Sequence, residues 1–446
     1  MNYNKSEYEK LLETPITFEI TSAGNIVWRA SETEYSVTLE YSKNGGTWTQ
    51  ITSTTAGASI TVLDGDTVQF RCGTDSGYDT MSGNNVFIGT TCGFKLKGNV
   101  MSLLNRNFAT LDTLQNDYTF AYLFVQCTGL TDASKLVLPA TTLADGCYNG
   151  MFQDCTNLTT APQLPATTLT GNCYERMFYG CTSLTTASEL PATTLAQYCY
   201  KQMFLGCTSL TTAPKLPATT LATSCYDGMF YKCTGLTTAP ELPATTLANN
   251  CYAEMFNGCS SLTTAPELPA TTLADSCYNN MFYSCTSLTT APELPATTLA
   301  AGCYIQMFNN CTSLTTAPEL PATTLANECY SYMFNNCTSL TTAPELPATT
   351  LASNCYEYMF SFCSSLTTAP ELPATTLTNN CYSNMFVGCT SLNHIKAMFT
   401  TTPSFSYTSN WVSGVASTGT FVKNSAATWN VTGTYGIPTG WTVQTA

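Results

Sequence analysis

Apolar residues recur every four positions through most of the chain, and short polar, proline-containing segments separate the groups. In one unit the spaced residues are Leu351, Cys355, Met359 and Cys363, with an aromatic residue directly after two of them. Apolar positions three or four apart predict one buried stripe of a helix. The segment 366–369, Leu-Thr-Thr-Ala, predicts a short strand, which ends there because the proline that follows has no backbone N–H.

This unit repeats with a period of 26 residues. Cysteines fall at position 147 and every 26 residues to 381, and again from 155 to 389. The ten copies read L-P-A-T-T-L-A-x-x-C-Y-x-x-M-F-x-x-C-T-S-L-T-T-A-P-E. One unit cannot bury its apolar face alone, so the repeat predicts a solenoid of stacked coils, each a helical arc plus a short strand. At a strand spacing of about 4.8 Å, the coils would extend roughly 50 Å.

A partial copy at about residues 118–143 precedes the ten repeats, with Thr119 where the first cysteine belongs. We interpret it as a capping coil and assign the solenoid to residues 101–395. Stacking turns each apolar position into a ladder, such as the tyrosines from 148 to 382 and the phenylalanines from 152 to 386. We expect phenylalanine, methionine and leucine to form the core, and the tyrosines to present their hydroxyls to solvent.

Residues 14–100 have a different pattern. Residues 37–41 alternate between apolar and polar, and Asn44-Gly45-Gly46 follows them. Two further apolar runs flank Asp64-Gly65-Asp66. Short alternating runs separated by such turns predict β-hairpins. Several short strands at this spacing predict a β-sandwich of immunoglobulin-like type.

The two ends of the chain are polar and distinct from the repeats. Residues 1–13 form a lead with an expected helical turn around Ser6–Glu13, suited to anchoring in an assembled particle. Residues 396–446 are rich in Thr, Ser and Gly and contain Trp411, Trp429 and Trp441. An open solenoid end exposes an apolar face and a strand edge. We therefore expect residues 396–446 to be a small β-rich cap, with a binding module as the alternative.

Charge excludes several classes of partner. Only 10% of the residues are charged and the net charge is −14, whereas about 25% are charged in an average globular protein. Nucleic-acid binding needs a basic surface, and so does adhesion to anionic lipid. No apolar run reaches the roughly 18 residues that a membrane span needs. The N-terminal sequence also lacks the basic and apolar regions of a signal peptide.

Of the 23 cysteines, 20 lie at the two repeating positions. On a continuous helix, two cysteines eight apart would be about 12 Å apart, beyond the roughly 7 Å that a disulfide allows between Cα atoms. We therefore predict ladders of reduced, buried thiols. The spacing does not suit structural zinc, which prefers pairs two to four residues apart. Cys72 and Cys92 lie outside the repeats, and their pairing is left open.

Catalysis finds no support in the sequence. The single histidine, His394, follows the last repeat, and a cysteine nucleophile needs a base such as histidine to form thiolate at neutral pH. We interpret His394 as a structural residue near the cap and predict a non-enzymatic protein.

The repeats differ from one another mainly around Cys-Tyr and Met-Phe. In one coil the variable positions are 301–302, 305–306 and 309–310, and the next coil varies at the equivalent positions. They form either a recognition surface or a set of exposed positions that drift without structural demand. Exposed aromatic residues are typical of binding hot spots. The candidate binding residues are Tyr332, Tyr358, Phe362, Asn309 and Asn335.

A glutamate ladder follows the invariant Thr-Thr-Ala-Pro segment. Its members are Glu241, Glu267, Glu293, Glu319, Glu345 and Glu371, with Glu189 earlier. Like charges about 5 Å apart repel each other. The carboxylates therefore point into water, become protonated, or are bridged by cations. Hard oxygen ligands suit Ca²⁺, so the ladder is a candidate site for Ca²⁺ or for a basic partner.

The pattern M-F-x-x-C-T-S-L-T-T-A-P-E-L-P resembles the BspA-like (Treponema pallidum type) leucine-rich repeats, whose signature is A-F-x-x-C-x-x-L followed by a short strand and proline. The resemblance covers about residues 120–395. Here methionine replaces the alanine, the unit is longer, and a second cysteine precedes tyrosine. The resemblance implies surface-displayed adhesion and binding of host proteins, without catalysis. The flanking segments look like those beside such repeats in gut bacteria and their phages.

The leading hypothesis is a phage virion fibre or decoration protein that binds a host surface. It would display the solenoid on the virion and dock through its N-terminal region. The alternatives are a bacterial cell-surface adhesin that binds host proteins, and a structural spacer. The partner would be a surface protein or glycan, without nucleic-acid binding or membrane insertion.

Overall fold

The computed structural model describes residues 5–73 and 85–446. Residues 1–4 of the expected N-terminal lead and 74–84 of the expected β-domain lie outside the described residues. Within the described residues, no helix is long and apolar enough to span a membrane. The chain forms two compact units: unit 1 is Met1–Ala218 with Cys233–Gly235, and unit 2 is Thr219–Lys232 with Leu236–Ala446.

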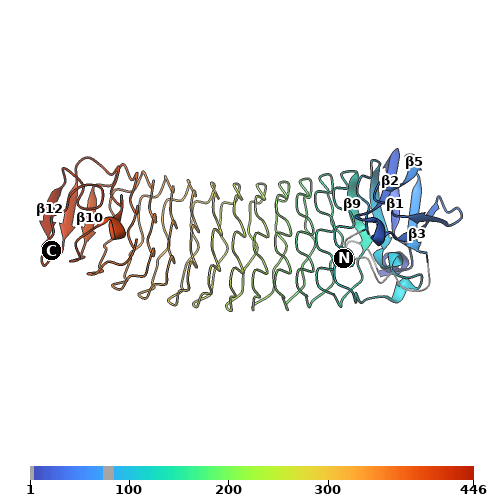
Figure 1. The fold of residues 1–446 in the computed structure, drawn as a ribbon, viewed down its shortest axis with the longest axis horizontal. Coiled ribbons are helices and arrows are strands. Elements are labelled where there is room, and N and C mark those ends of the chain that lie inside the picture. Colours follow the sequence, from blue (N-terminus) through green and yellow to red (C-terminus); the bar gives the residue numbers. More distant parts are fainter. Residues whose placement is uncertain (1–4, 74–84) are drawn as a thin grey trace. The chain divides into compact units, whose positions relative to one another are not determined.

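Unit 1 begins with helix α1 (Lys5–Leu12), which confirms the helical turn expected around Ser6–Glu13. Nine strands follow, labelled in part in Figure 1, and they make two sheets. The first sheet has the order β4 (Thr49–Thr52), β3 (Thr38–Lys43), β6 (Thr67–Cys72), β1 (Thr17–Ser22), β8 (Gly93–Asn99), β9 (Leu130–Val137). The second has the order β5 (Ala58–Val62), β2 (Gly24–Ala30), β7 (Asn85–Val86). Three 3-10 turns accompany them: η1 (Thr33–Tyr35), η2 (Val100–Leu103) and η3 (Phe108–Thr110).

An aromatic core joins the two sheets. The ring of Phe87 lies 4.7 Å from that of Trp28 on β2 and 5.0 Å from that of Phe18 on β1, measured between centroids. The first sheet does not end with the β-domain, because β8 pairs in parallel with β9 in the partial repeat. The β-rich character predicted for residues 14–100 is therefore present, and the immunoglobulin-like topology remains a prediction.

The arc of each repeat is not a helix, so the predicted helical stripe is wrong. In the coil at residues 351–363, Met359 N donates to Tyr356 O at 3.2 Å, within the same coil. The next N–H, from Phe360, donates instead to Met385 O of the following coil at 3.0 Å. An α-helix would use both groups internally. The arc is a chain of four-residue turns, and every second N–H ties it to the neighbouring coil.

The predicted strand of each repeat is also reduced. Within the repeats, the structure places isolated parallel bridges between threonines of successive coils, such as Thr264 with Thr290 and Thr324 with Thr350. Prolines on both sides of the exposed glutamate remove backbone donors, so ladders longer than one bridge do not form there.

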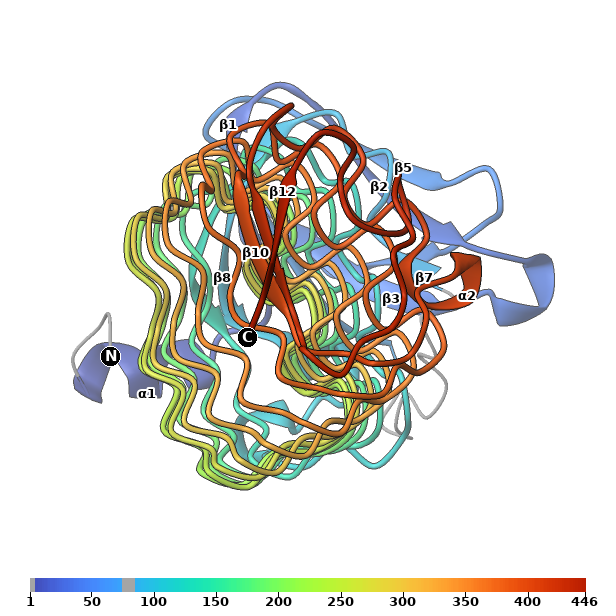
Figure 2. The same cartoon turned by 90° about the vertical axis from the view of Figure 1, so that its left-hand side faces the viewer.

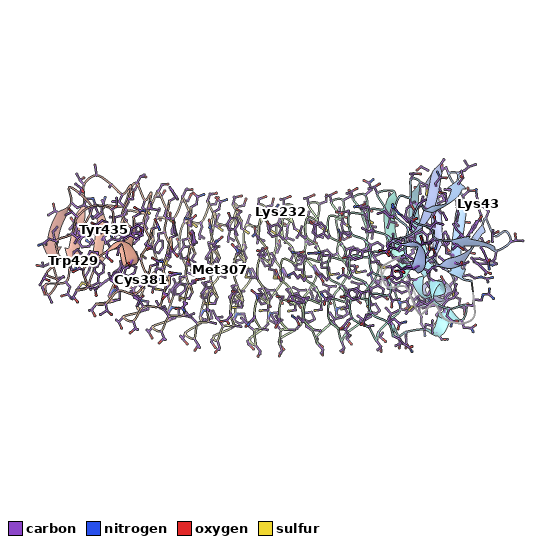
Figure 3. The ribbon with its side chains drawn as sticks, in the orientation of Figure 1. Lys43, Lys232, Met307, Cys381, Trp429 and Tyr435 are labelled. Atoms are coloured by element: carbon purple, nitrogen blue, oxygen red, sulfur yellow. The ribbon has the colours of Figure 1, made fainter. Side chains whose placement is uncertain are left out.

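Side chains stack into ladders inside the coils of each unit. In unit 2 the rings of Phe308 and Phe334 are 5.7 Å apart between centroids and nearly parallel, at 6°. Met307, labelled in Figure 3, is buried in the same coil. The tyrosine ladder is also core: Tyr278 is only 1% exposed. The prediction that these hydroxyls face solvent is wrong, because the turn that buries the preceding cysteine buries the tyrosine too.

All 23 cysteines are buried thiols rather than disulfides, which confirms the predicted ladders and includes Cys72 and Cys92. The second cysteine of a repeat bonds across coils: the Cys389 thiol donates to Phe360 O at 2.9 Å. The same carbonyl accepts the N–H of Cys363 at 3.1 Å. A thiol is thus a small apolar side chain that also supplies a weak donor between coils.

Unit 2 ends in three parallel strands, β10 (His394–Ala397), β11 (Thr420–Lys423) and β12 (Thr442–Thr445), with helix α2 (Phe405–Thr408) between β10 and β11. Figure 2 shows β10 and β12 in front of the coils of this unit. His394 pairs with Thr420, so the spacing of 26 residues persists after the sequence motif is lost. Trp411 O accepts from Phe386 N at 2.8 Å, as an ordinary coil would. The β-rich segment expected at residues 396–446 therefore closes the unit by continuing its backbone pairing.

Candidate functional site

Every fourth residue of each arc has positive φ. In the coil at residues 351–363 these are Asn354 (55°), Tyr358 (53°) and Phe362 (60°). Stacking aligns the equivalent residues of successive coils within each unit into three rows, here called the left-handed rows. Each four-residue turn needs one such residue to reverse the chain, so the rows are a property of the backbone.

Glycine and asparagine tolerate positive φ best. They occupy about half of the left-handed positions of unit 2: Gly228, Asn250, Gly258, Asn280, Gly302, Asn310, Asn336, Asn354, Asn380, Asn384 and Gly388. Half of the variable positions found in the sequence, such as 302, 306 and 310, are left-handed. These positions therefore do carry a structural demand, and free drift does not explain which residues fill them.

Side chains of the left-handed rows lean over the next coil. A Cβ atom added to Gly388 would collide with Cδ1 of Phe362, one coil earlier. In unit 1, Tyr122 covers Gly150 in the same way, and its ring would collide with such a Cβ. A large residue on a left-handed row can thus be followed by a glycine, as at Gly388 and Gly150, or by a parallel ring, as Tyr332 is by Tyr358, at the same place in the next coil.

Tyr332, Tyr358 and Phe362 form the aromatic patch of unit 2. The rings of Tyr332 and Tyr358 stack across two coils with centroids 4.3 Å apart at 10°. Phe362 is 53% exposed, and the tyrosines are half-buried. Burial first, and then Tyr358, raises the pKa of Tyr332 to about 12. All three residues have positive φ, where a bulky side chain costs about 1 kcal/mol or more. The sequence predicted these residues but not their backbone conformation.

The two asparagine candidates differ. Asn335 is half-buried and remains a candidate. Asn309 is only 8% exposed, so its expected place on the solvent side is wrong, whereas Asn335 holds the equivalent position of the next coil. The neighbouring left-handed asparagines instead form a ladder: Asn336 Nδ2 donates to Asn310 Oδ1 at 2.7 Å.

The glutamate ladder is exposed from Glu241 to Glu371. Adjacent coils leave shallow grooves beside it, of about 380 Å³ around Glu319 and about 340 Å³ around Glu345, lined mainly by proline, alanine and leucine. Glu371 forms an ion pair with Lys396, with 3.0 Å between Glu371 Oε2 and Lys396 Nζ. In the described part of the chain, no three His, Cys, Asp or Glu side chains gather closely enough to hold a metal ion. A Ca²⁺ site on this ladder stays a prediction.

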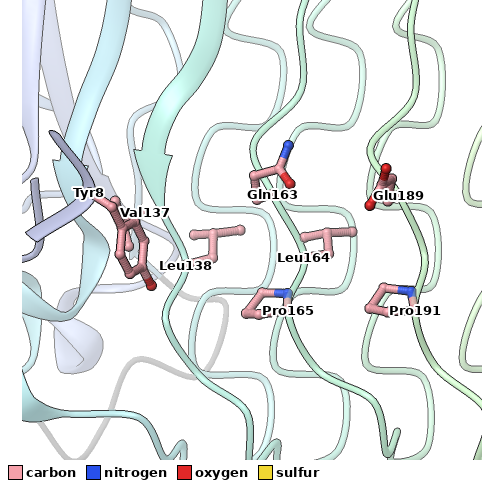
Figure 4. Close-up of a pocket in the computed structure, with 8 residues that line it drawn as sticks. All are labelled: Tyr8, Val137, Leu138, Gln163, Leu164, Pro165, Glu189 and Pro191. Carbon is pink, nitrogen blue, oxygen red and sulfur yellow. The ribbon is translucent and has the colours of Figure 1, made fainter. Parts of the chain in front are cut away.

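A small pocket of about 210 Å³ lies in unit 1, where Tyr8 of α1 meets the leucine–proline rows of the first coils. Figure 4 shows Leu138 and Leu164 in successive coils, with Gln163 and Glu189 aligned above them. Its walls are apolar and periodic, and its polar side chains lie in line along the rows rather than converging on one point. The pocket therefore reflects how α1 packs on the coils.

The groups in the repeats with the most reactive chemistry are the cysteine thiols, and they are deeply buried. Burial raises the pKa of the Cys337 thiol to about 12, and that of Cys303 likewise to about 12. Such thiols stay protonated at neutral pH and cannot act as nucleophiles. His394 lies on β10, and its Nδ1 atom is buried without a hydrogen-bond partner. The thiols are therefore placed for packing rather than for proton transfer.

Comparisons with known proteins agree with the repeat. A family model described as the BspA type leucine rich repeat region matches in six copies, over residues 121–263, 222–298 and 275–410. No curated protein matches the chain. A solved structure described as a TLR13–ssRNA13 complex is similar at 14% identity with a TM-score of 0.28, over 73% of this chain and 43% of that one. That chain is thus more than twice as long as the part matched, and the low score adds nothing to the description of the fold.

Proposed function

The chain belongs to the BspA-type leucine-rich repeat family, and from that premise we propose that it is a non-catalytic adhesion protein that binds its partner through the left-handed rows. Repeats of this family are typically surface-exposed, and the family is typically non-enzymatic. The rows hold half of the variable positions and change from coil to coil, whereas the Thr-Thr-Ala-Pro-Glu face is nearly constant.

The aromatic patch is the observation that carries this proposal. Tyr332, Tyr358 and Phe362 occupy positions where Gly or Asn would relieve strain, so each of these residues lowers the stability of its coil. Strained residues that persist are characteristic of functional sites, and exposed aromatic residues dominate the binding energy of many interfaces. Because these residues do not stabilise the coil, binding to a partner would explain their presence.

Two carriers fit the proposal. One is a phage virion, where the protein would be a fibre or decoration component that binds a host surface, and the other is the surface of a bacterial cell. Capsid or tail genes beside the coding sequence would support the first. A precursor with a secretion signal would support the second and contradict the first.

The test replaces the patch with the residues that the backbone prefers. The triple variant Y332N/Y358N/F362G keeps the turns and removes the rings. The native protein and the variant would be applied to arrays of surface proteins and glycans and to intact bacterial cells. We expect saturable binding by the native chain to at least one probe and at least a tenfold loss in the variant, since losing three hot-spot residues removes well over about 1.4 kcal/mol.

Matched deletions separate recognition from a spacer role. Deleting residues 326–377 removes two whole repeats that contain the entire patch, and deleting residues 248–299 removes two whole repeats without it. Both shorten the chain equally. Recognition predicts that only the first deletion abolishes binding. Equal binding by both deletions, or by the triple variant and the native chain, would contradict the proposal.

A further inference from the structure

A long stretch of the chain has carboxylates but no basic side chain. Between Lys232, labelled in Figure 3, and Lys396 there is no lysine or arginine. The ten carboxylates in this stretch are Glu241, Glu254, Glu267, Asp275, Glu293, Glu319, Glu328, Glu345, Glu357 and Glu371. The surface of these coils therefore has an unbalanced negative charge, which a cationic partner would neutralise.

Two of these carboxylates lie at the aromatic patch. Glu328 occupies the first left-handed row in the coil of Tyr332, and Glu357 precedes Tyr358. Partial burial, and then the charge of Glu328, raises the pKa of Glu357. The polar contact of Glu328 is the amide of Asn354 at 3.4 Å. Within residues 5–73 and 85–446, neither carboxylate forms an ion pair.

Other tyrosines of the arcs already have a cation beside them. In unit 1, Lys201 Nζ lies 5.2 Å from the centroid of the Tyr198 ring. In unit 2, Lys232 Nζ lies 5.2 Å from the Tyr231 ring. Cation–π contact of this kind is favourable within about 6 Å of the ring. The stacked rings of Tyr332 and Tyr358 have two carboxylates beside them instead, so a cation there has to come from another molecule.

We propose that the aromatic patch, together with Glu328 and Glu357, is the docking site for a lysine or arginine side chain of a partner protein. The inference rests on the proposed function and names the chemistry of its partner. Aromatic faces attract the cation and its apolar stem, and the carboxylates supply charge-assisted hydrogen bonds. Two carboxylates are too few to enclose Ca²⁺, which takes six to eight oxygen ligands.

The probe is a short acetylated peptide of alternating glycine and arginine, labelled with fluorescein, and its citrulline analogue is the neutral control. Anisotropy titration at low ionic strength would use the full chain and three variants. These are E328Q/E357Q at the patch, Y332N/Y358N/F362G at the patch, and E319Q/E345Q on the glutamate ladder. We expect about a tenfold or greater loss of affinity in both patch variants and less than about a twofold change in the ladder variant.

Several results would overturn the inference. Equal loss in E319Q/E345Q would show diffuse attraction to the ladder, and equal binding of the citrulline peptide would show that charge plays no part. Binding that requires added Ca²⁺ would indicate a bridging metal. Array binding that survives E328Q/E357Q but not Y332N/Y358N/F362G would leave the proposed function standing and reject the cation. Survival in both would reject the proposed function as well.

Discussion

At the scale of single residues, the backbone and the surface compete for the same positions. A residue with positive φ is needed in every turn, and glycine or asparagine satisfies it with least strain. The sequence shows that these positions vary, but not why, because a variable exposed residue looks the same whether its φ is positive or negative. Tyr332, Tyr358 and Phe362 could therefore be predicted as candidates from exposure alone, and their strain could not.

The contact between Phe362 and Gly388 gives a direct test of how the rows lean. Gly388 has a φ of 74°, and an added Cβ would collide with the Phe362 ring. We expect Gly388→Ala to lower the free energy of unfolding by about 1–3 kcal/mol. In a Phe362→Gly background the loss should shrink, because only the backbone strain remains. Urea unfolding of the four proteins measures the coupling, and strictly additive effects would refute the contact.

At the scale of elements, the repeat predicted the solenoid but not the shape of its arc. A spacing of four residues approximates the 3.6 residues of an α-helical turn. Over two turns, however, a helix would rotate the stripe by about 80°, whereas Cys355, Met359 and Cys363 all remain buried. The adjacent buried pairs, such as Cys355 with Tyr356, indicate a period of four. Hydrogen bonds between coils stabilise that period, and no single repeat contains them.

The arc structure predicts a specific circular dichroism spectrum. Apart from the eight residues of α1 and the four of α2, the described residues contain no α-helix. We expect the far-ultraviolet spectrum of the folded chain to lack the helical double minimum. A strong helical spectrum would support the helical stripe predicted from the sequence and would contradict the left-handed rows.

Each phenylalanine of the stacked ladder should stabilise the coils on either side of it. Phe308 is fully buried and stacks on Phe282 at 5.6 Å and Phe334 at 5.7 Å between centroids. We expect Phe308→Ala to cost about 3–5 kcal/mol, from lost burial and the cavity that remains. Because a repeat contacts mainly its neighbours, hydrogen exchange should accelerate most in the adjacent coils. Uniform acceleration across the whole chain would argue against this local coupling.

At the scale of the whole molecule, the titratable groups that the core buries in greatest number are cysteine thiols and tyrosine hydroxyls. Burial raises the pKa of thiols such as Cys233, Cys251 and Cys337 to about 12, and it also raises the pKa of ladder tyrosines such as Tyr278 well above the usual tyrosine value. At a pH below the pKa that each group has in the unfolded chain, all of these groups are neutral in both the folded and the unfolded state. Their burial then carries no cost from charge. The charge that does act at neutral pH is the unbalanced negative charge of the coils.

Stability should therefore depend on pH in one direction. Above about pH 8.5 the unfolded chain loses thiol protons that the folded chain retains, so each thiol lowers the free energy of unfolding by up to about 1.4 kcal/mol per pH unit. We expect the Tm to change little between about pH 6 and about pH 8 and to fall steeply above about pH 9. Differential scanning calorimetry measures this, and a Tm that is constant to about pH 11 would contradict the burial of the thiols.

Bulky residues on the left-handed rows lower the stability of the coils and provide binding to a partner. The most direct test measures both quantities on one pair of proteins, the native chain and Y332N/Y358N/F362G. We expect a variant whose Tm is equal or higher, because strain at three residues is relieved, and whose binding to the partner or probe is at least about tenfold weaker. A variant that binds as well as the native chain, or that loses binding only because its Tm falls, would contradict it.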